Sequence, residues 1–294
     1  MRIVILGCRG QLGSDCLRVF EKENGVVCAG HQDVDIADPE QVREVIGSHK
    51  PEVVINCAAF TRVDLCETEI DTAFRINAMG PGIIAGACRK SGALMVHVST
   101  DYVFDGNREP PLSYCENDAT DPLSVYGRTK LEGEIRVTAE SPDNIVLRTA
   151  WLYGIGGSNF LKTMLRLTLN KPGTPIKVVN DQFGSPTWTL RLALQMEKLI
   201  KAGGRGLYHA TSEGYCSWYE LACYFLKQME VAHTLVPCST AEYPLPAKRP
   251  ANSILENARL KRANINRMTG WRDGVDRFVS SFRQDLLAEC SRIS

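Results

Sequence analysis

The fold is decided by the first stretch of the chain, Met1-Arg2-Ile3-Val4-Ile5-Leu6-Gly7-Cys8-Arg9-Gly10-Gln11-Leu12-Gly13. Its apolar run at 3–6 predicts a buried strand, and 11–23 predicts a helix with one apolar face. Glycines at 7, 10 and 13 lie between the two elements. Glycines at such a turn let the backbone approach a pyrophosphate, whose charge lies at the helix N-terminus. The stretch therefore predicts a dinucleotide-binding turn; the alternative is a tight turn that binds no ligand.

The first half of the chain repeats this alternation of strand and helix. Apolar runs without polar alternation predict strands buried on both faces, at 26–29, 53–55, 93–98 and 145–147. Helices are expected from Asp38-Pro39 onward, over 70–90 with an interruption at Gly80-Pro81-Gly82, and over 124–139. Alternating strands and helices form parallel sheets with right-handed crossovers. We therefore expect an α/β fold in which residues 1–150 form an NAD(P)-binding domain around a Rossmann-type, doubly wound parallel sheet.

After about residue 150 the composition of the sequence changes, because Gly and Pro cluster at 154–157, 171–175 and 243–250. Helices are expected at 160–169, 190–201 and 218–230, and short strands at 176–179 and 207–210. Residues 151–294 are therefore expected to form a smaller, mixed α/β, substrate-binding region, interleaved with the first.

Composition narrows the class of protein. The chain has 294 residues, 44% of them hydrophobic, and its 34 basic residues balance its 34 acidic ones, which gives a net charge of zero. A globular protein without a basic excess is a poor partner for nucleic acid. The first apolar run is too short for a signal peptide or a membrane span. The eleven cysteines lack zinc-ligand spacing. We expect reduced thiols, a cytoplasmic location, and no membrane or nucleic-acid partner.

Candidate acid–base residues follow the fourth expected strand. Tyr126 and Lys130 are spaced i and i+4, so a helix places them on one face. A nearby ammonium favours the phenolate of a tyrosine and lowers its pKa, which suits a carbonyl–alcohol interconversion. Ser99 or Thr100 ends the strand at the edge where parallel sheets bind ligands, and its hydroxyl would contact the substrate oxygen. The alternatives are an exposed amphipathic pair and a hydroxyl that merely caps the strand.

The residues after the second expected strand bear on cofactor preference. An acid at this strand tip often binds the adenosine ribose. Here Gly30-His31-Gln32 occupies that place, and Asp33 comes later. Arg9, within the glycine turn, would hold a 2′-phosphate, although a solvated surface charge is the alternative. This favours NADPH as the cofactor, with NADH possible.

In order and separation, these features resemble the extended short-chain dehydrogenase/reductase family. Longer stretches resemble the dTDP-4-dehydrorhamnose reductase family, and they lie at 98–106, 122–130, 148–153, 159–160, 180–187 and 249–253. The resemblance implies NAD(P)H-dependent reduction of the C4 ketone of dTDP-4-dehydro-6-deoxy-L-mannose (dTDP-6-deoxy-L-lyxo-4-hexulose) to dTDP-L-rhamnose. This is the last step of dTDP-rhamnose biosynthesis.

The resemblance also implies roles for individual residues. Tyr126 would donate the proton, Lys130 would anchor the nicotinamide ribose, and Thr100 would orient the reacting oxygen. With the glycine turn, the expected cofactor contacts are Gly7, Arg9, Gly10, Gln11, Leu12, Gly13, Asp35, Ile36, Ala59, Phe60, Thr61, Val98, Tyr126 and Lys130. The expected substrate contacts are Thr100, Asp101, Trp151 stacked on the thymine, and Arg249 paired with the diphosphate. A core tryptophan is the alternative for Trp151.

Two other functions stay open at this point. One is reduction of another dTDP-4-keto-6-deoxy sugar. The other is a non-catalytic NADP-binding regulatory subunit, similar to the β-subunit of methionine adenosyltransferase. Some relatives are described as metal-bridged dimers that use acidic residues near the C-terminus. The corresponding segment 283–290 carries only Asp285 and Glu289, so we expect no metal, and a monomer or homodimer.

Overall fold

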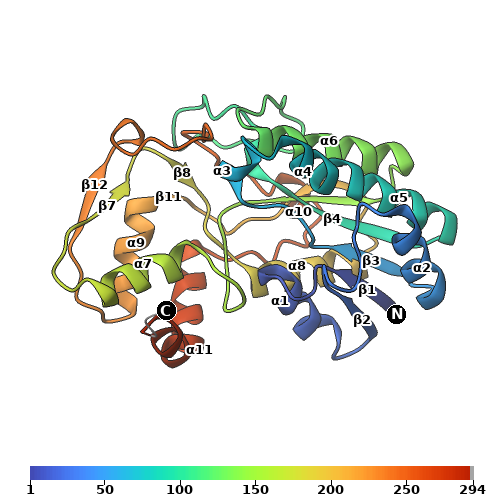
Figure 1. Ribbon diagram of the computed structural model, residues 1–294, viewed down its shortest axis with the longest axis horizontal. Coiled ribbons are helices and arrows are strands. Elements are labelled where there is room, and N and C mark those ends of the chain that lie inside the picture. Colours follow the sequence, from blue (N-terminus) through green and yellow to red (C-terminus); the bar gives the residue numbers. More distant parts are fainter. Residues whose placement is uncertain (292–294) are drawn as a thin grey trace.

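A six-stranded parallel sheet forms the centre of the larger part of the protein (Figure 1). The computed structural model describes residues 1–291. The strands are β1 (Arg2–Leu6), β2 (Gly25–Ala29), β3 (Val53–Asn56), β4 (Leu94–Thr100), β5 (Ile145–Thr149) and β10 (Gly206–His209), in the spatial order β10-β5-β4-β3-β1-β2. The predicted α/β fold is confirmed. Because β1 pairs with β2 on one side and β3 on the other, the strand order reverses at β1, where open sheets bind ligands.

Alternation along β1 explains how one apolar strand serves two cores. Ile3 and Ile5 pack towards α1 (Gln11–Phe20) and α8 (Thr189–Lys201). Val4 and Leu6 pack on the opposite face, towards α2 (Pro39–His49) and α5 (Gly80–Ser91). All four side chains are almost completely buried. Burial of each such side chain contributes about 1.5–3 kcal/mol to the free energy of folding. A polar residue at any of these positions would therefore destabilise one of the two cores.

The predicted helix starts coincide with side-chain caps. Asp38 accepts hydrogen bonds from the backbone N–H groups of Glu40 and Gln41 at the start of α2. Ser124 caps α6 (Val125–Glu140), and Asn159 caps α7 (Phe160–Asn170). Such a cap stabilises a helix by about 1 kcal/mol. It therefore fixes where α6 begins, and with it the positions of the acid–base candidates.

The predicted interruption at Gly80-Pro81-Gly82 is wrong. The chain stays helical through α4 (Ile70–Phe74), a π-helical turn (Arg75–Met79) and α5. Pro81 lies in the first turn of α5, where its missing N–H is tolerated best. The irregularity is the wider turn before it. Such turns are frequent at functional sites, and this one brings Arg75 to a cavity described below.

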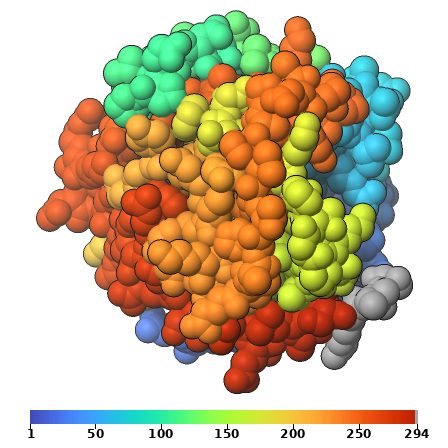
Figure 2. Space-filling model, turned by 90° about the vertical axis from the view of Figure 1, so that its left-hand side faces the viewer, coloured from blue at the N-terminus to red at the C-terminus, as the bar shows by residue number. Residues whose placement is uncertain are grey.

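Residues after 150 contribute to both parts of the molecule. β10 extends the main sheet beside β5, and α8 covers α1. Three short pairs lie outside this sheet: β6 (Leu152–Tyr153) with β9 (Thr187–Trp188), β7 (Ile176–Val179) with β12 (Leu235–Cys238), and β8 (Phe183–Gly184) with β11 (Cys216–Ser217). A separate core joins α7, α9 (Trp218–Gln228) and α11 (Trp271–Cys290). Figure 2 shows this later part of the chain covering most of one side of the molecule. The remaining α-helices within residues 1–291 are the short α3 (Val63–Cys66) and α10 (Ala258–Arg262).

The expectation that every cysteine is a reduced thiol is wrong for one pair. Cys8, in the glycine turn after β1, forms a disulfide with Cys28 of β2. The two strands are parallel neighbours, and Ile5 lies opposite Cys28 in their register. A residue that follows β1 therefore reaches the end of β2, which no spacing rule along the sequence reveals. The other nine cysteines are free.

Within residues 1–291, no helix combines the length and the apolarity that crossing a bilayer requires.

Candidate functional site

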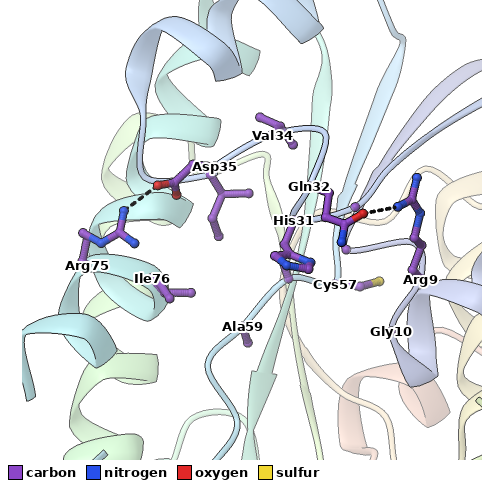
Figure 3. A pocket seen from close by; sticks show the side chains of 14 residues that line it. Arg9, Gly10, His31, Gln32, Val34, Asp35, Cys57, Ala59, Arg75 and Ile76 are labelled. Atoms are coloured by element: carbon purple, nitrogen blue, oxygen red, sulfur yellow. Dashed lines mark hydrogen bonds and ion pairs between the residues drawn. The ribbon is translucent and has the colours of Figure 1, made fainter. Parts of the chain in front are cut away.

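A cavity of 670 Å³ lies at the carboxyl ends of β1, β2 and β3 (Figure 3). This is the edge at which the strand order reverses. Six residues of the expected cofactor set line it: Gly7, Arg9, Gly10, Asp35, Ile36 and Ala59. Sequence reasoning missed Arg75 and Ile76, which the π-helical turn supplies from a distant part of the sequence.

The glycine turn has the close backbone approaches that a dinucleotide turn needs. Gly7 has φ of +75°, and a Cβ there would lie 2.7 Å from the backbone nitrogen of Ala58. A Cβ at Gly13 would overlap the carbonyl oxygen of Gly7. Gly10 is the N-cap residue of α1 and offers no side chain to the first N–H groups of the helix. These N–H groups are therefore available to an anion such as a pyrophosphate.

Two arginines, Arg9 and Arg75, lie at opposite ends of this cavity (Figure 3). Each is paired with a carboxylate. The Arg9 guanidinium is 3.1 Å from Asp33 and 3.3 Å from the Gln32 amide oxygen. The Arg75 guanidinium is 2.6 Å from Asp35 and holds the pKa of that carboxyl below its ordinary value. Arg9 lies beside the residues that follow β2, where the 2′-position of an adenosine ribose is expected.

Tyr126 and Lys130 lie on α6, as the sequence predicts. The Lys130 side chain is buried, with 2% of the residue exposed, and its Nζ donates to the Val98 carbonyl oxygen at 2.6 Å. Burial lowers the Lys130 pKa to about 8. Burial also raises the pKa of Tyr126, and a hydrogen bond with Thr100 opposes this only in part. The net direction is opposite to the expected lowering of the Tyr126 pKa, because desolvation of the phenolate dominates.

Thr100 and Asp101 extend the site beyond β4. The Thr100 hydroxyl donates to Asp101 Oδ1 at 2.9 Å and accepts from the Tyr102 N–H at 3.2 Å. It therefore caps the turn after the strand and also contacts Tyr126. Asp101 is buried, and burial raises its pKa to about 6. The Ser253 hydroxyl lies near Asp101 but donates to the Phe183 carbonyl at 3.4 Å, so Asp101 Oδ2 has no hydrogen-bond partner among the described residues. A buried oxygen without a partner is costly, so a ligand hydroxyl that donates to it would stabilise the site.

Asn77 is a buried residue of this site that sequence reasoning missed. Its Oδ1 accepts from the Phe60 N–H at 2.8 Å, and its Nδ2 donates to the Phe60 carbonyl at 3.0 Å and to Thr129 at 3.2 Å. It thus ties the loop after β3 to α6. Phe60 and Tyr126 pack against the same small core, and Thr61 is exposed. Neither Phe60 nor Thr61 lines the 670 Å³ cavity, and their cofactor contacts stay predictions.

A second cavity, of 560 Å³, lies between α7, α9 and the loop that precedes residue 250. Its lining holds three cations, Lys177, Lys248 and Arg249, and three aromatic residues, Phe160, Trp218 and Tyr243. No Asp or Glu within the described chain lines it. Cations with aromatic faces suit a ligand that carries a phosphate and a base.

Trp151 does not line this second cavity. Its indole stacks on that of Trp218, with ring centroids 3.4 Å apart and planes at 3°. The tryptophan exposed to the cavity is Trp218, which begins α9 directly after its Ser217 capping box. Sequence reasoning recognised this helix start but not the role of its first residue.

Comparison with known proteins identifies the family. Residues 1–284 match the family described as RmlD substrate binding domain. The chain belongs to this family. It is 36% identical to dTDP-4-dehydrorhamnose reductase from Burkholderia thailandensis, over 98% of this chain and 100% of the relative. It is 38% identical to spore coat polysaccharide biosynthesis protein SpsK from Bacillus subtilis, over 95% and 96% of the two chains. The expected family is confirmed.

Solved structures of RmlD family members agree with the fold. A dTDP-4-dehydrorhamnose reductase from Clostridium acetobutylicum has a TM-score of 0.93 and 40% identity, over 97% of this chain and 100% of its own. One from Bacillus anthracis, solved in complex with NADP, has a TM-score of 0.92 and 37% identity, over 95% and 99% of the two chains.

The C-terminal acids of this family member lie on α11. Glu289 pairs with the buried Lys162 at 2.8 Å, and Lys162 also donates to the Gly157 carbonyl at 2.9 Å. Across the described part of the chain, no group of three or more His, Cys, Asp or Glu is placed to hold a metal. The absence of a metal stays a prediction.

Proposed function

We propose that this protein reduces the C4 ketone of dTDP-4-dehydro-6-deoxy-L-mannose to dTDP-L-rhamnose with NADPH, as a cytoplasmic monomer or homodimer. One observation carries the proposal: Tyr126, with Thr100 beside it and the buried Lys130 one helical turn away, lies between two cavities. Ala59 of the first cavity is followed by Phe60, which packs against the same small core as Tyr126. Leu123 of the second cavity precedes the cap of the same helix.

The protonation states of these side chains suit reduction. The raised pKa of Tyr126 keeps its hydroxyl protonated at neutral pH, so that it can donate a proton to the oxygen at C4. Bound NADPH supplies the hydride to C4. Lys130, still an ammonium below its pKa of about 8, stabilises the phenolate that Tyr126 becomes. Thr100 lies beside Tyr126, where its hydroxyl would contact the reacting oxygen.

The second cavity provides for the rest of the substrate. We propose that residues 151–294 supply most of its contacts, with the diphosphate held by Arg249 and its neighbouring lysine. Trp218 presents an aromatic face to the thymine, and Trp151 supports that face from behind. Stacking of a base on an aromatic ring is worth about 1–3 kcal/mol. Asp101 accepts a hydrogen bond from a sugar hydroxyl through its buried Oδ2.

The test mixes purified protein with NADPH and the authentic dTDP-4-keto sugar and follows NADPH oxidation. Tyr126→Phe should lower the rate by about 10²–10⁴-fold, the usual contribution of a positioned acid. Tyr215→Phe is the matched control, because it removes the hydroxyl of an exposed tyrosine outside both cavities. Equal rates for Tyr126→Phe and wild type would contradict the proposal.

A second candidate is reduction of a different dTDP-4-keto-6-deoxy sugar. It has specific support, since the chain is 41% identical, over 75% of its length, to a dTDP-4-keto-6-deoxy-D-glucose reductase from Streptomyces niveus. Rates over a panel of such sugars, compared as kcat/KM, separate the two. A regulatory subunit would not need Tyr126, Lys130 and Thr100 to be intact. It would oxidise no NADPH with any sugar of the panel.

A further inference from the structure

An ion pair joins the two parts of the chain beside the second cavity. Both terminal nitrogens of Arg249 donate to Asp64 of α3, Nη1 to Oδ1 at 2.9 Å and Nη2 to Oδ2 at 2.8 Å. Nη1 also donates to the Ala247 carbonyl at 3.1 Å, and Asp64 Oδ1 accepts the Ala247 N–H at 3.2 Å. The Arg249 side chain is 17% exposed and the Asp64 side chain 36%. The guanidinium is therefore held in one orientation by a carboxylate and by its own loop.

This arrangement leaves one edge of the guanidinium without a carboxylate partner. Asp64 takes the end of the planar group, and Ala247 takes the remaining hydrogen of Nη1. The N–H of Nε and the second N–H of Nη2 lie together on the other edge. The Tyr102 hydroxyl lies close to the guanidinium, and no second carboxylate within residues 1–291 pairs with it. Such an edge matches two oxygens of a phosphate in a bidentate fashion. Arg249 lines the second cavity, so a ligand there would meet its side chain.

We infer that Asp64 is a positioning residue for the diphosphate of the sugar nucleotide, because it fixes Arg249 end-on and leaves the Nε–Nη2 edge for the ligand. This rests on the proposed function, which takes the second cavity as the sugar-nucleotide site. Asp64 does not itself contact the diphosphate. Its contribution is the orientation of a side chain that otherwise has several freely rotating bonds.

The inference opposes what simple electrostatics predicts. A carboxylate beside an anion site repels the ligand, so neutralising Asp64 should strengthen binding if only its charge matters. If orientation matters, neutralisation should weaken binding. In Asp64→Asn the amide NH₂ would face an N–H of Arg249, and the two-point contact would be lost. The sign of the change in affinity therefore separates the two explanations.

The experiment measures calorimetric affinities for dTDP and for thymidine, which lacks the diphosphate. Asp64→Asn should weaken dTDP binding by about tenfold and leave thymidine binding unchanged. Asp71→Asn is the matched control, since it removes the charge of an exposed acid on the neighbouring α4. Asp64→Glu, which keeps a carboxylate, should recover part of the loss. Unchanged NADPH affinity shows that the first cavity is intact.

A double-mutant cycle decides whether Asp64 acts through Arg249. In an Arg249→Ala background, Asp64→Asn should change dTDP affinity less than twofold. An equal loss in both backgrounds would mean that Asp64 merely supports the loop, and tighter dTDP binding by Asp64→Asn would favour the charge explanation; either result overturns the inference alone. Failure of the wild type to bind dTDP would overturn the proposed function as well.

Discussion

The buried ammonium of Lys130 should make the stability of the protein depend on pH. Its pKa of about 8 lies about 2.5 units below the ordinary lysine value of 10.5. At about 1.36 kcal/mol per unit, the buried charge costs about 3 kcal/mol at neutral pH. Between about pH 8 and pH 10.5 the unfolded lysine keeps its proton and the folded one loses it. The unfolded state then binds more protons, so stability rises with pH across this window.

Lys130→Met removes this dependence. Methionine has a similar length and no charge, so the cost of about 3 kcal/mol disappears at pH 7. The Val98 carbonyl loses its donor, which costs about 1–3 kcal/mol and largely offsets the gain. The absolute stability of the variant should therefore stay within about 2 kcal/mol of wild type. The change of stability with pH is a more specific test. From about pH 7 to pH 9.5, the free energy of unfolding of the wild type should increase by about 2 kcal/mol relative to that of the variant.

Urea unfolding at the two pH values, followed by tryptophan fluorescence, measures this difference. Lys22→Met serves as the control, because Lys22 is exposed and its charge is solvated in both states. It should show the pH dependence of wild type. If Lys130→Met also shows it, the ammonium is not destabilised by burial and the reasoning fails. In the wild-type protein, turnover should fall as pH rises through about 8, because Lys130 then loses the charge that stabilises the Tyr126 phenolate.

Two further predictions concern the cofactor and the core. Arg9→Ala should weaken NADPH binding about tenfold relative to NADH, because its guanidinium lies where a 2′-phosphate is expected; an unchanged ratio of the two affinities would contradict the assignment. Glu134→Ala should lower the free energy of unfolding by about 3–5 kcal/mol, since the Arg148 guanidinium, 2.7 Å from Glu134 and almost completely buried, would lose its counter-charge. A loss below about 1 kcal/mol in urea unfolding would show that this pair is dispensable.

The parts of the fold that the sequence predicts are those set by local interactions. The strand at 3–6 is predictable because four consecutive apolar side chains serve two cores. The start of α6 is predictable because Ser124 satisfies a backbone N–H three residues on. The glycine turn follows the same logic only in part: Gly10 and Gly13 approach Gly7 a few positions away, whereas Gly7 approaches Ala58, which follows β3. Local rules therefore place Tyr126 and Lys130 correctly.

The parts that were missed depend on contacts between distant segments. The Cys8–Cys28 disulfide needs two strands to become neighbours. The contact of Asp64 with Arg249 joins residues 185 positions apart. The raised pKa of Tyr126 depends on its burial in the folded protein, which the sequence of α6 alone does not reveal. A motif indicates which residue types are present, whereas burial and pairing, which set their chemistry, appear only once the chain is folded.

The basic and acidic residues of the chain are equal in number, and the arginines at its two cavities are likewise paired one to one with carboxylates. Three arginines at the two cavities are each paired with a carboxylate: Arg9 with Asp33, Arg75 with Asp35, and Arg249 with Asp64. Exposed pairs are worth only about 0–1 kcal/mol. Arg9 and its partner are 60% and 40% exposed, so this arginine can exchange its partner for a phosphate at little cost. The pair at Arg249 is more buried and joined by two hydrogen bonds, and exchange there would leave Asp64 without its counter-charge. A ligand that binds the Nε–Nη2 edge of Arg249 avoids that cost. The ion pair at the first cavity therefore keeps Arg9 available for exchange with a phosphate, whereas the ion pair at the second cavity orients Arg249.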